Sequence, residues 1–393
     1  MKKNITLFLL GATPALFAAI DAGTYQNETL DALILNQTNA DSDWVFENVE
    51  FTSTGDVNLA TNYDVSYDIN LKNTSADLSQ LRIQRSQGST TFNVQGSESD
   101  RAAVNITGGT WKTYVNASTA SDSTAVNKLS LGGYADFSAS TFCMASDAGF
   151  LSGTAMVDIS GASNTFTITG ATYLNRQNAN EASKTTNVYF NISGVEGAKS
   201  AATFGGDFSL NAGGTGEIQV NMKGNAQMTV AGKFNLANDS NNNGKATFSI
   251  TGENNEFIHN GGYFLLGADA TGGIGEFIIE GKNNVVTVAG QTYIGTNKTS
   301  TSAAILKIKG TGHQINFNNN TFVMRNTSDA NSSTLIFAAD ADGTSALNVK
   351  KIGGMCALEI DFTDFVGNET GIYEQTLIQA KTIGQTLLYA LKE

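Results

Sequence analysis

Proline is almost absent from this chain: the only one among 393 residues is Pro14. Proline has no N–H to donate to a sheet ladder, so its absence beyond residue 14 suits a body of paired β-strands. Positive charge is also scarce, with 23 Lys and Arg against 36 Asp and Glu and a net charge of −13. Because nucleic-acid binding needs a basic surface, this balance argues against a nucleic-acid partner.

Long apolar runs are scarce as well. The main one, residues 5–19, follows two lysines and is too short and interrupted to predict a membrane span. Small residues follow it, which is typical of a secretory leader. We therefore expect a leader over residues 1–22, with Ala18, Ala19 and Ala22 as alternative cleavage positions. We also expect an exported protein, secreted or associated with the cell surface, with no spanning segment beyond the leader.

Repetition is what the chain has in abundance. The sequence FSITG at 248–252 recurs as FIIEG at 277–281, and FLLG at 264–267 recurs as TYIG at 292–295. A fixed period of about 29 residues indicates a repeat architecture, in which each copy is one turn that cannot bury its apolar face alone.

From about residue 101 the repeat can be aligned over nine units, each with three short runs of alternating apolar residues, which is the β-strand pattern. The first run closes on an apolar residue, and another apolar residue stands two positions earlier in every unit. The closing residues are Ile106, Leu131, Ile159, Ile192, Met222, Ile250, Ile279, Ile308 and Phe337. The third run ends in a similar column formed by Val115, Met144, Leu174, Leu210, Leu236, Leu266, Ile294 and Met324.

Three strands per turn with like residues in like positions predict an all-β, right-handed parallel β-helix with a period of about 29–30 residues. We expect an N-terminal cap and irregular early turns over 23–100, the regular β-helix over 101–350, and a C-terminal turn or cap over 351–393. In this fold the two cysteines, Cys143 and Cys356, lie about seven turns apart, on the order of 34 Å. That exceeds disulfide reach, so we expect two thiols.

The repeat unit resembles the passenger domain of bacterial autotransporters and autotransporter-associated repeat proteins. The copies at 246–296 carry this likeness best, the segment 358–380 resembles the close of such passengers, and the likeness covers roughly 100–380. It implies a secreted or surface-displayed β-helix in a Gram-negative-type envelope. Such proteins continue into an outer-membrane barrel, whereas this sequence stops at Glu393, so it is either a passenger cut from a longer product or a free secreted relative.

Parallel β-helices also include polysaccharide lyases and hydrolases, which place carboxylates on outward positions of neighbouring turns. The second run has an outward stripe of hydroxyl and amide residues: Ser138, Thr167, Thr203, Thr229, Ile258, Thr287, Asn316 and Asn348. The first run contributes Asn105 and a lone carboxylate, Asp158, to these positions. Because glycoside hydrolysis needs a pair of carboxyl groups, we predict no catalytic, cofactor or metal site and a non-enzymatic protein.

Three features could have either a functional or a purely structural role. His259 falls in an inward apolar column, and it is either a titratable or ligand group, a neutral core histidine with a backbone partner, or a residue turned outward by a bulge. Asp239–Gly244 and Asp340–Gly343 resemble calcium loops but lack the full ligand set, so Asx-rich turns are the favoured interpretation. Outward Tyr114, Tyr173 and Tyr293 suggest a glycan-stacking surface, although they are not on adjacent turns.

The favoured hypothesis is therefore an adhesin-like or structural module of the autotransporter-passenger type. Its partner would be a host or environmental glycan or a surface protein. The two alternatives are a polysaccharide lyase or hydrolase of the pectin-lyase-like fold and a glycan-binding module.

Overall fold

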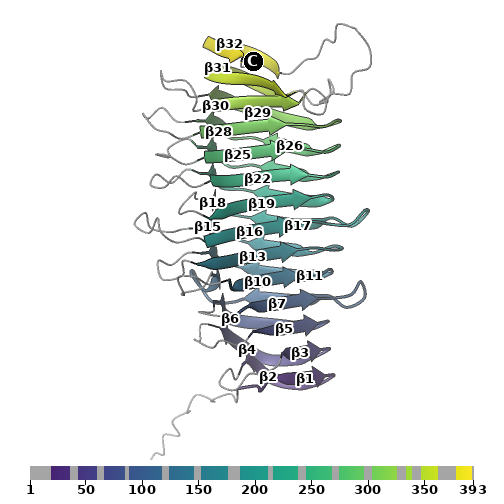
Figure 1. Cartoon of the computed structure of the whole chain (residues 1–393). Helices are drawn as coiled ribbons and strands as arrows, with labels where there is room; N and C mark the ends of the chain where they lie inside the picture. The colour runs from purple at the N-terminus through teal and green to yellow at the C-terminus, as the bar shows by residue number, and fades with distance from the viewer. Residues whose placement is uncertain are drawn as a thin grey trace, which may run out of the picture.

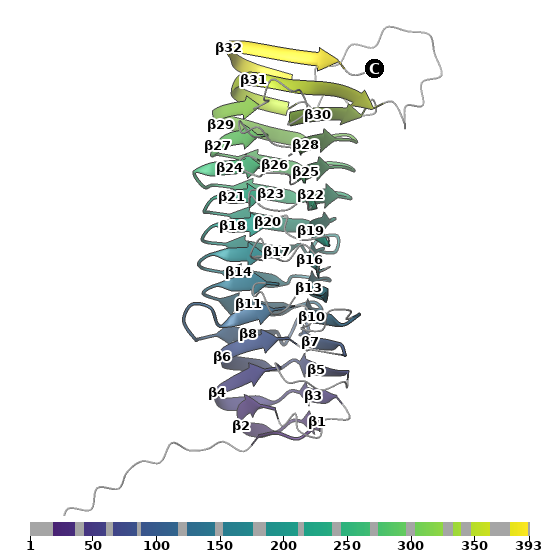
Figure 2. The ribbon, with the colours of Figure 1, turned by 60° about the vertical axis from the view of Figure 1, so that its left-hand side comes forward.

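The computed structural model describes residues 19–35, 43–59, 66–84, 88–116, 124–145, 152–175, 186–210, 216–237, 245–267, 274–295, 303–324, 333–338, 347–361 and 378–391. These residues form strands and connecting turns, with every named strand pairing parallel to its neighbours, in a column of stacked coils (Figure 1). The predicted all-β solenoid is confirmed, with about eight turns that have the regular three-strand form. The first and last strands lie at opposite ends of the column (Figure 2).

The strands form three vertical columns because each pairs with the equivalent strand one turn away. The first column contains β1 (Gly23–Gln26), β3 (Trp44–Glu47), β5 (Tyr67–Lys72), β7 (Thr90–Gln95), β10 (Val126–Leu131), β13 (Gly153–Ile159), β16 (Thr186–Ile192), β19 (Glu217–Lys223), β22 (Lys245–Thr251), β25 (Ile274–Ile279), β28 (Ala303–Ile308) and β30 (Ser333–Ala338). The second contains β2 (Thr29–Ile34), β4 (Glu50–Asn58), β6 (Ser75–Ile83), β8 (Ala102–Ile106), β11 (Ala135–Ala139), β14 (Thr165–Ile168), β17 (Ser200–Phe204), β20 (Ala226–Val230), β23 (Glu256–His259) and β26 (Val285–Val288).

The third column contains β9 (Thr113–Val115), β12 (Phe142–Met144), β15 (Thr172–Leu174), β18 (Phe208–Leu210), β21 (Phe234–Leu236), β24 (Tyr263–Leu266) and β27 (Gln291–Ile294). At both ends of the solenoid, longer strands take the place of two short ones. Near the N-terminus β6 pairs with both β8 and β9. Near the C-terminus the long strands are β29 (Gln314–Met324), β31 (Leu347–Asp361) and β32 (Ile378–Leu391).

The first column corrects one assignment made from the sequence. We expected Val104 and Ile106 in the first column, but β8 pairs with β11, which places Val104 beside Phe137 in the second. The first-column strand of that turn is β7, where Phe92 pairs with Leu129. Two apolar pairs in one turn look alike in sequence, and only the pairing of the strands shows which column each belongs to.

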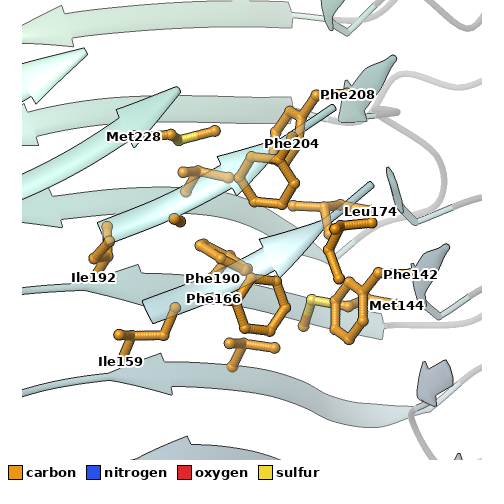
Figure 3. Packing of buried hydrophobic residues seen from close by; sticks show 14 of the residues in the cluster. Phe142, Met144, Ile159, Phe166, Leu174, Phe190, Ile192, Phe204, Phe208 and Met228 are labelled. Carbon is orange, nitrogen blue, oxygen red and sulfur yellow. The ribbon is translucent and has the colours of Figure 1, made fainter. Parts of the chain in front are cut away.

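A single hydrophobic core runs through the solenoid from Leu33 to Val349. The predicted inward ladders form it, with Phe248 stacked on Phe277 at 5.0 Å between ring centroids and Phe234 stacked on Phe264 at 4.9 Å. Figure 3 shows the same packing in the middle turns, where phenylalanine rings and aliphatic side chains fill the interior. Each buried side chain contributes roughly 1.5–3 kcal/mol relative to exposure.

The stacking also separates the two cysteines. Seven successive strand pairings lead from β12, which contains Cys143, to the first half of β31, the strand that contains Cys356. At roughly 4.8 Å per pairing this is on the order of 34 Å, beyond disulfide reach. Cys143 is a buried thiol.

Candidate functional site

The outward side of the second column forms a polar stripe that is longer than the sequence indicated. The pairings confirm the predicted order from Ser138 to Asn348, and they add Asn105 and Asp77 at its N-terminal end. We define the polar stripe as Asp77, Asn105, Ser138, Thr167, Thr203, Thr229, Ile258, Thr287, Asn316 and Asn348.

Hydrogen bonds connect the N-terminal end of this stripe. Ser138 Oγ donates to Asn105 Oδ1 at 2.7 Å, and Asn105 Nδ2 donates to Asp77 Oδ1 at 3.2 Å. The expectation that the second-column stripe has no carboxylate is therefore wrong at Asp77. The misassignment of Asn105 to the first column concealed it.

Asp77 also lines a groove of about 300 Å³ between β4 and β6. We call it the β4 groove; its lining residues are Phe51, Thr52, Ser53, Thr54, Ser75, Ala76 and Asp77. The groove forms where the register between β4 and β6 shifts between Glu50 and Gly55, so that the strands no longer pair continuously. Its volume is at the lower end of the range for small-molecule sites, and one aromatic ring, several hydroxyls and a carboxylate could bind a polyhydroxy ligand.

A second feature is built on the third column, around Trp111. This side chain is 37% exposed, and its ring stacks on Tyr173 with centroids 5.7 Å apart and planes 24° from parallel. Tyr173 lies two turns further along the solenoid, because Tyr114, Cys143 and Tyr173 occupy successive positions of one outward column. We call Trp111, Tyr114 and Tyr173 the aromatic platform.

The predicted glycan-stacking tyrosines are thus brought into two groups rather than one. Tyr114 lies under the Arg82 guanidinium, 5.1 Å from its ring centroid, at the N-terminal side of the platform. Tyr293 instead faces Tyr263, which is 42% exposed, at a centroid distance of 6.3 Å. Four strand pairings separate Tyr173 from Tyr293, on the order of 19 Å.

Trp111 is the functional candidate that the sequence search missed. It lies in the turn before β9, outside the alternating strand pattern from which outward residues were assigned. Composition did hold one signal, because the chain has only two tryptophans. The other, Trp44, is fully buried.

His259 occupies an inward position between Val230 and Val288 and is fully buried. Its Nε2 donates to the Gly232 carbonyl at 3.0 Å. A Cβ on Gly261 or Gly290 would approach the imidazole to 2.9 Å, so these glycines make room for the ring. Burial lowers the pKa of His259 to about 4. It is therefore a neutral core histidine with a backbone partner, and the explanation by an outward bulge is wrong.

His313 belongs to a different buried row, just before the second-column strands. Its members are Asn164, Asn255, Asn284 and His313, which we call the corner ladder. Each donates to the carbonyl four residues earlier, as Asn255 does to Thr251 at 2.7 Å and His313 does to Lys309 at 2.9 Å. Each also accepts from a backbone N–H of the preceding turn, as His313 Nδ1 does from Asn284 at 3.3 Å. His313 thus makes the same kinds of hydrogen bond as the asparagines at the equivalent positions of the other turns.

Several acidic side chains of the described residues form ion pairs. Asp158, the outward first-column carboxylate singled out from the sequence, contacts Lys128 at 2.8 Å, and Glu276 of the same column contacts Lys245 at 2.7 Å. Within the described ranges, no three His, Cys, Asp or Glu side chains gather closely enough to hold a metal ion. The two calcium-loop candidates, 239–244 and 340–343, lie outside the described residues. No helix in the described part of the chain has the length and apolar character needed to cross a membrane.

No known protein family, curated protein or solved structure matches this chain in the comparisons made.

Proposed function

We propose that this protein is an exported, non-enzymatic β-solenoid that acts as an adhesin-like or structural rod, similar in role to an autotransporter passenger. The observation that carries the proposal is the continuity of one apolar core through the stacked turns. Eleven pairings from β1 to β30 give a length on the order of 50 Å. Such a scaffold can hold a binding surface at a distance from its point of attachment.

Hydrogen bonds in the first turn indicate which of the predicted leader-cleavage positions would leave that turn intact. Ile20 donates its N–H to the Ile34 carbonyl at 2.7 Å, and its own carbonyl accepts from the Trp44 indole at 3.0 Å. Cleavage after Ala18 or Ala19 would keep both bonds, whereas cleavage after Ala22 would remove Ile20. We therefore favour the earlier positions, which mass spectrometry of the mature N-terminus would distinguish.

Surface display can be tested by expressing the full chain, with an epitope tag in the segment 296–302, in a Gram-negative host. We expect the tag to be accessible to antibody and to added protease on intact cells. A matched variant in which residues 5–19 carry three charged substitutions should retain the protein inside. Equal retention of both forms in the cytoplasm would contradict the proposal.

A polysaccharide-active enzyme is the second candidate, and the β4 groove is the observation that favours it. Asp77 is the one carboxylate among the groove's described lining residues. If the groove is catalytic, Asp77→Asn should abolish turnover of a polysaccharide panel measured by reducing ends or unsaturated products. We expect no turnover by either form, and turnover that is lost in Asp77→Asn would overturn the non-enzymatic proposal.

A further inference from the structure

We infer that Trp111 and Tyr173 form a binding site for the sugar rings of a neutral polysaccharide. The inference adds a ligand to the proposed role of a presenting rod, on which it rests. Three observations carry it: the backbone conformation of Trp111, the arrangement of the rings, and the character of the surface around them.

The backbone at Trp111 is strained. Its φ is +61°, in the left-handed region that bulky residues rarely adopt. The Trp111 N–H donates to Thr141 Oγ1 at 2.8 Å, which helps to hold this conformation. A glycine or asparagine would satisfy such a turn at lower cost, as Asn254 and Asn283 do elsewhere in the solenoid. Tyr134 and Ala237 adopt the same backbone conformation in this chain, and ligand-binding positions are among those at which such strain is retained.

The rings form a continuous surface across two turns. Trp111 precedes β9, yet its indole stacks on Tyr173 of β15, so it crosses the turn that contains Cys143. Cys143 is only 1% exposed although it occupies an outward position. Trp111 nevertheless keeps more than a third of its residue surface open to solvent. The stacked pair thus spans the turn that contains Cys143 and leaves part of Trp111 accessible to a ligand.

The surroundings favour a carbohydrate over a protein or a charged polymer. The exposed part of the Trp111 indole can contact the C–H face of a pyranose ring, and the Tyr173 hydroxyl can hydrogen-bond to sugar hydroxyls. A stable protein partner would cover about 800 Å² on this side, with an apolar centre. Within the described residues, however, the exposed large hydrophobic side chains are only Trp111, Val195 and Tyr263. Arg82 is the cation that lies on the platform, over Tyr114, while the net charge of −13 disfavours a polyanionic polysaccharide along the rod, and we therefore take a neutral chain as the occupant.

The test is a titration of the purified full chain with five neutral trisaccharides: cellotriose, laminaritriose, xylotriose, maltotriose and triacetylchitotriose. We expect at least one to shift the tryptophan fluorescence, because Trp111 is exposed and the other tryptophan, Trp44, is fully buried. Calorimetry should then show that Trp111→Ala and Tyr173→Ala each weaken binding at least about tenfold, the loss of roughly 1.4 kcal/mol. Trp111→Phe should restore part of the affinity.

Tyr263→Ala is the matched control, because it removes an exposed aromatic ring from β24, which lies three strand pairings, on the order of 14 Å, from Tyr173 and five pairings from β9. It should bind as the wild type does. The inference is overturned if the wild type binds none of the five probes at millimolar concentration, or if Trp111→Ala binds unchanged. If the protein binds a trisaccharide but is not displayed on cells, only the proposed presenting role is refuted. If it is displayed but binds none of the trisaccharides, only the proposed sugar site is refuted.

Discussion

The middle and the N-terminal turns of this solenoid are built from the same repeat but differ in register. From β8 to β26 the second-column strands pair without a register shift. In the N-terminal turns the pairings of β2 with β4 and of β4 with β6 both shift register. The β4 groove opens at such a shift, and the aromatic platform begins at β9, directly beyond these turns. A register shift thus creates the β4 groove, whereas the aromatic platform combines regularly paired tyrosines with Trp111, which lies in a turn outside the strands.

The two regions also differ at the corner before the second column. In the middle turns Asn255 and Asn284 are linked, with Asn255 N and Nδ2 both donating to Asn284 Oδ1 at 3.0 Å. In the N-terminal turns the corresponding residue is Thr74, whose hydroxyl accepts from Val49 N at 3.1 Å. A hydroxyl offers fewer bonds than an amide, so the middle corner is more firmly held.

The largest effect should come from charge in the middle core. Ile250→Asp places a carboxylate in a fully buried ladder between Met222 and Ile279. We expect the free energy of unfolding to fall by about 4 kcal/mol or more, because the charge has no partner there. Urea unfolding measures this. Thr287→Ala, at an outward position of a nearby turn, should change it by less than about 0.5 kcal/mol. Equal effects would show that the inward and outward assignments are wrong.

The corner ladder should give the next largest effect. Asn284→Ala removes the acceptor of two bonds from Asn255 and the donor of bonds to Gly252 and Glu280. Since several buried groups lose partners, we expect a loss of about 2–4 kcal/mol in urea unfolding. His313→Asn should cost less than about 1 kcal/mol, because an amide can make both of the bonds His313 makes. If His313→Asn lowered the free energy of unfolding more than Asn284→Ala does, His313 would not be equivalent to an asparagine at this position.

Acid should weaken the middle turns through His259. An unfolded histidine takes up a proton near pH 6.5, whereas folded His259 does so only near pH 4, so between these values the unfolded state binds more protons. Its contribution is full above about pH 6.5 and falls as the pH drops toward 4, by about 2 kcal/mol at pH 5. Comparing wild type with His259→Val from pH 7.5 to 4.5 isolates the effect from the carboxylates. Parallel pH profiles of the two proteins would contradict it.

The smallest effect is expected at the platform. Trp111→Gly relieves a left-handed backbone, which stabilises, but loses the stacking on Tyr173, which destabilises. Each change is on the order of 1 kcal/mol, so the free energy of unfolding should move by less than about 1 kcal/mol. Thermal unfolding provides the measurement. A large loss of stability would mean that Trp111 is mainly a packing residue.

Much of the fold could be predicted because stacked turns need similar residues at equivalent positions, and this repetition is visible in the sequence. Ile250 and Ile279 recur at the same place in successive repeats, and the structure pairs them. The column of Val104 could not be assigned, because a turn contains several similar apolar pairs. The stacking of Trp111 on Tyr173 could not be predicted, since it joins a turn to a strand two turns away. Handedness and export stay predictions.

The most direct test of this division between stability and binding compares Asn284→Ala with Trp111→Ala by calorimetric titration with the best-binding trisaccharide, at a temperature where both variants are folded. We expect Asn284→Ala to bind with wild-type affinity despite its lower stability, and Trp111→Ala to bind at least about tenfold more weakly. Equal weakening in both variants would contradict the claim that the aromatic platform, rather than the buried corner ladder, carries the binding function.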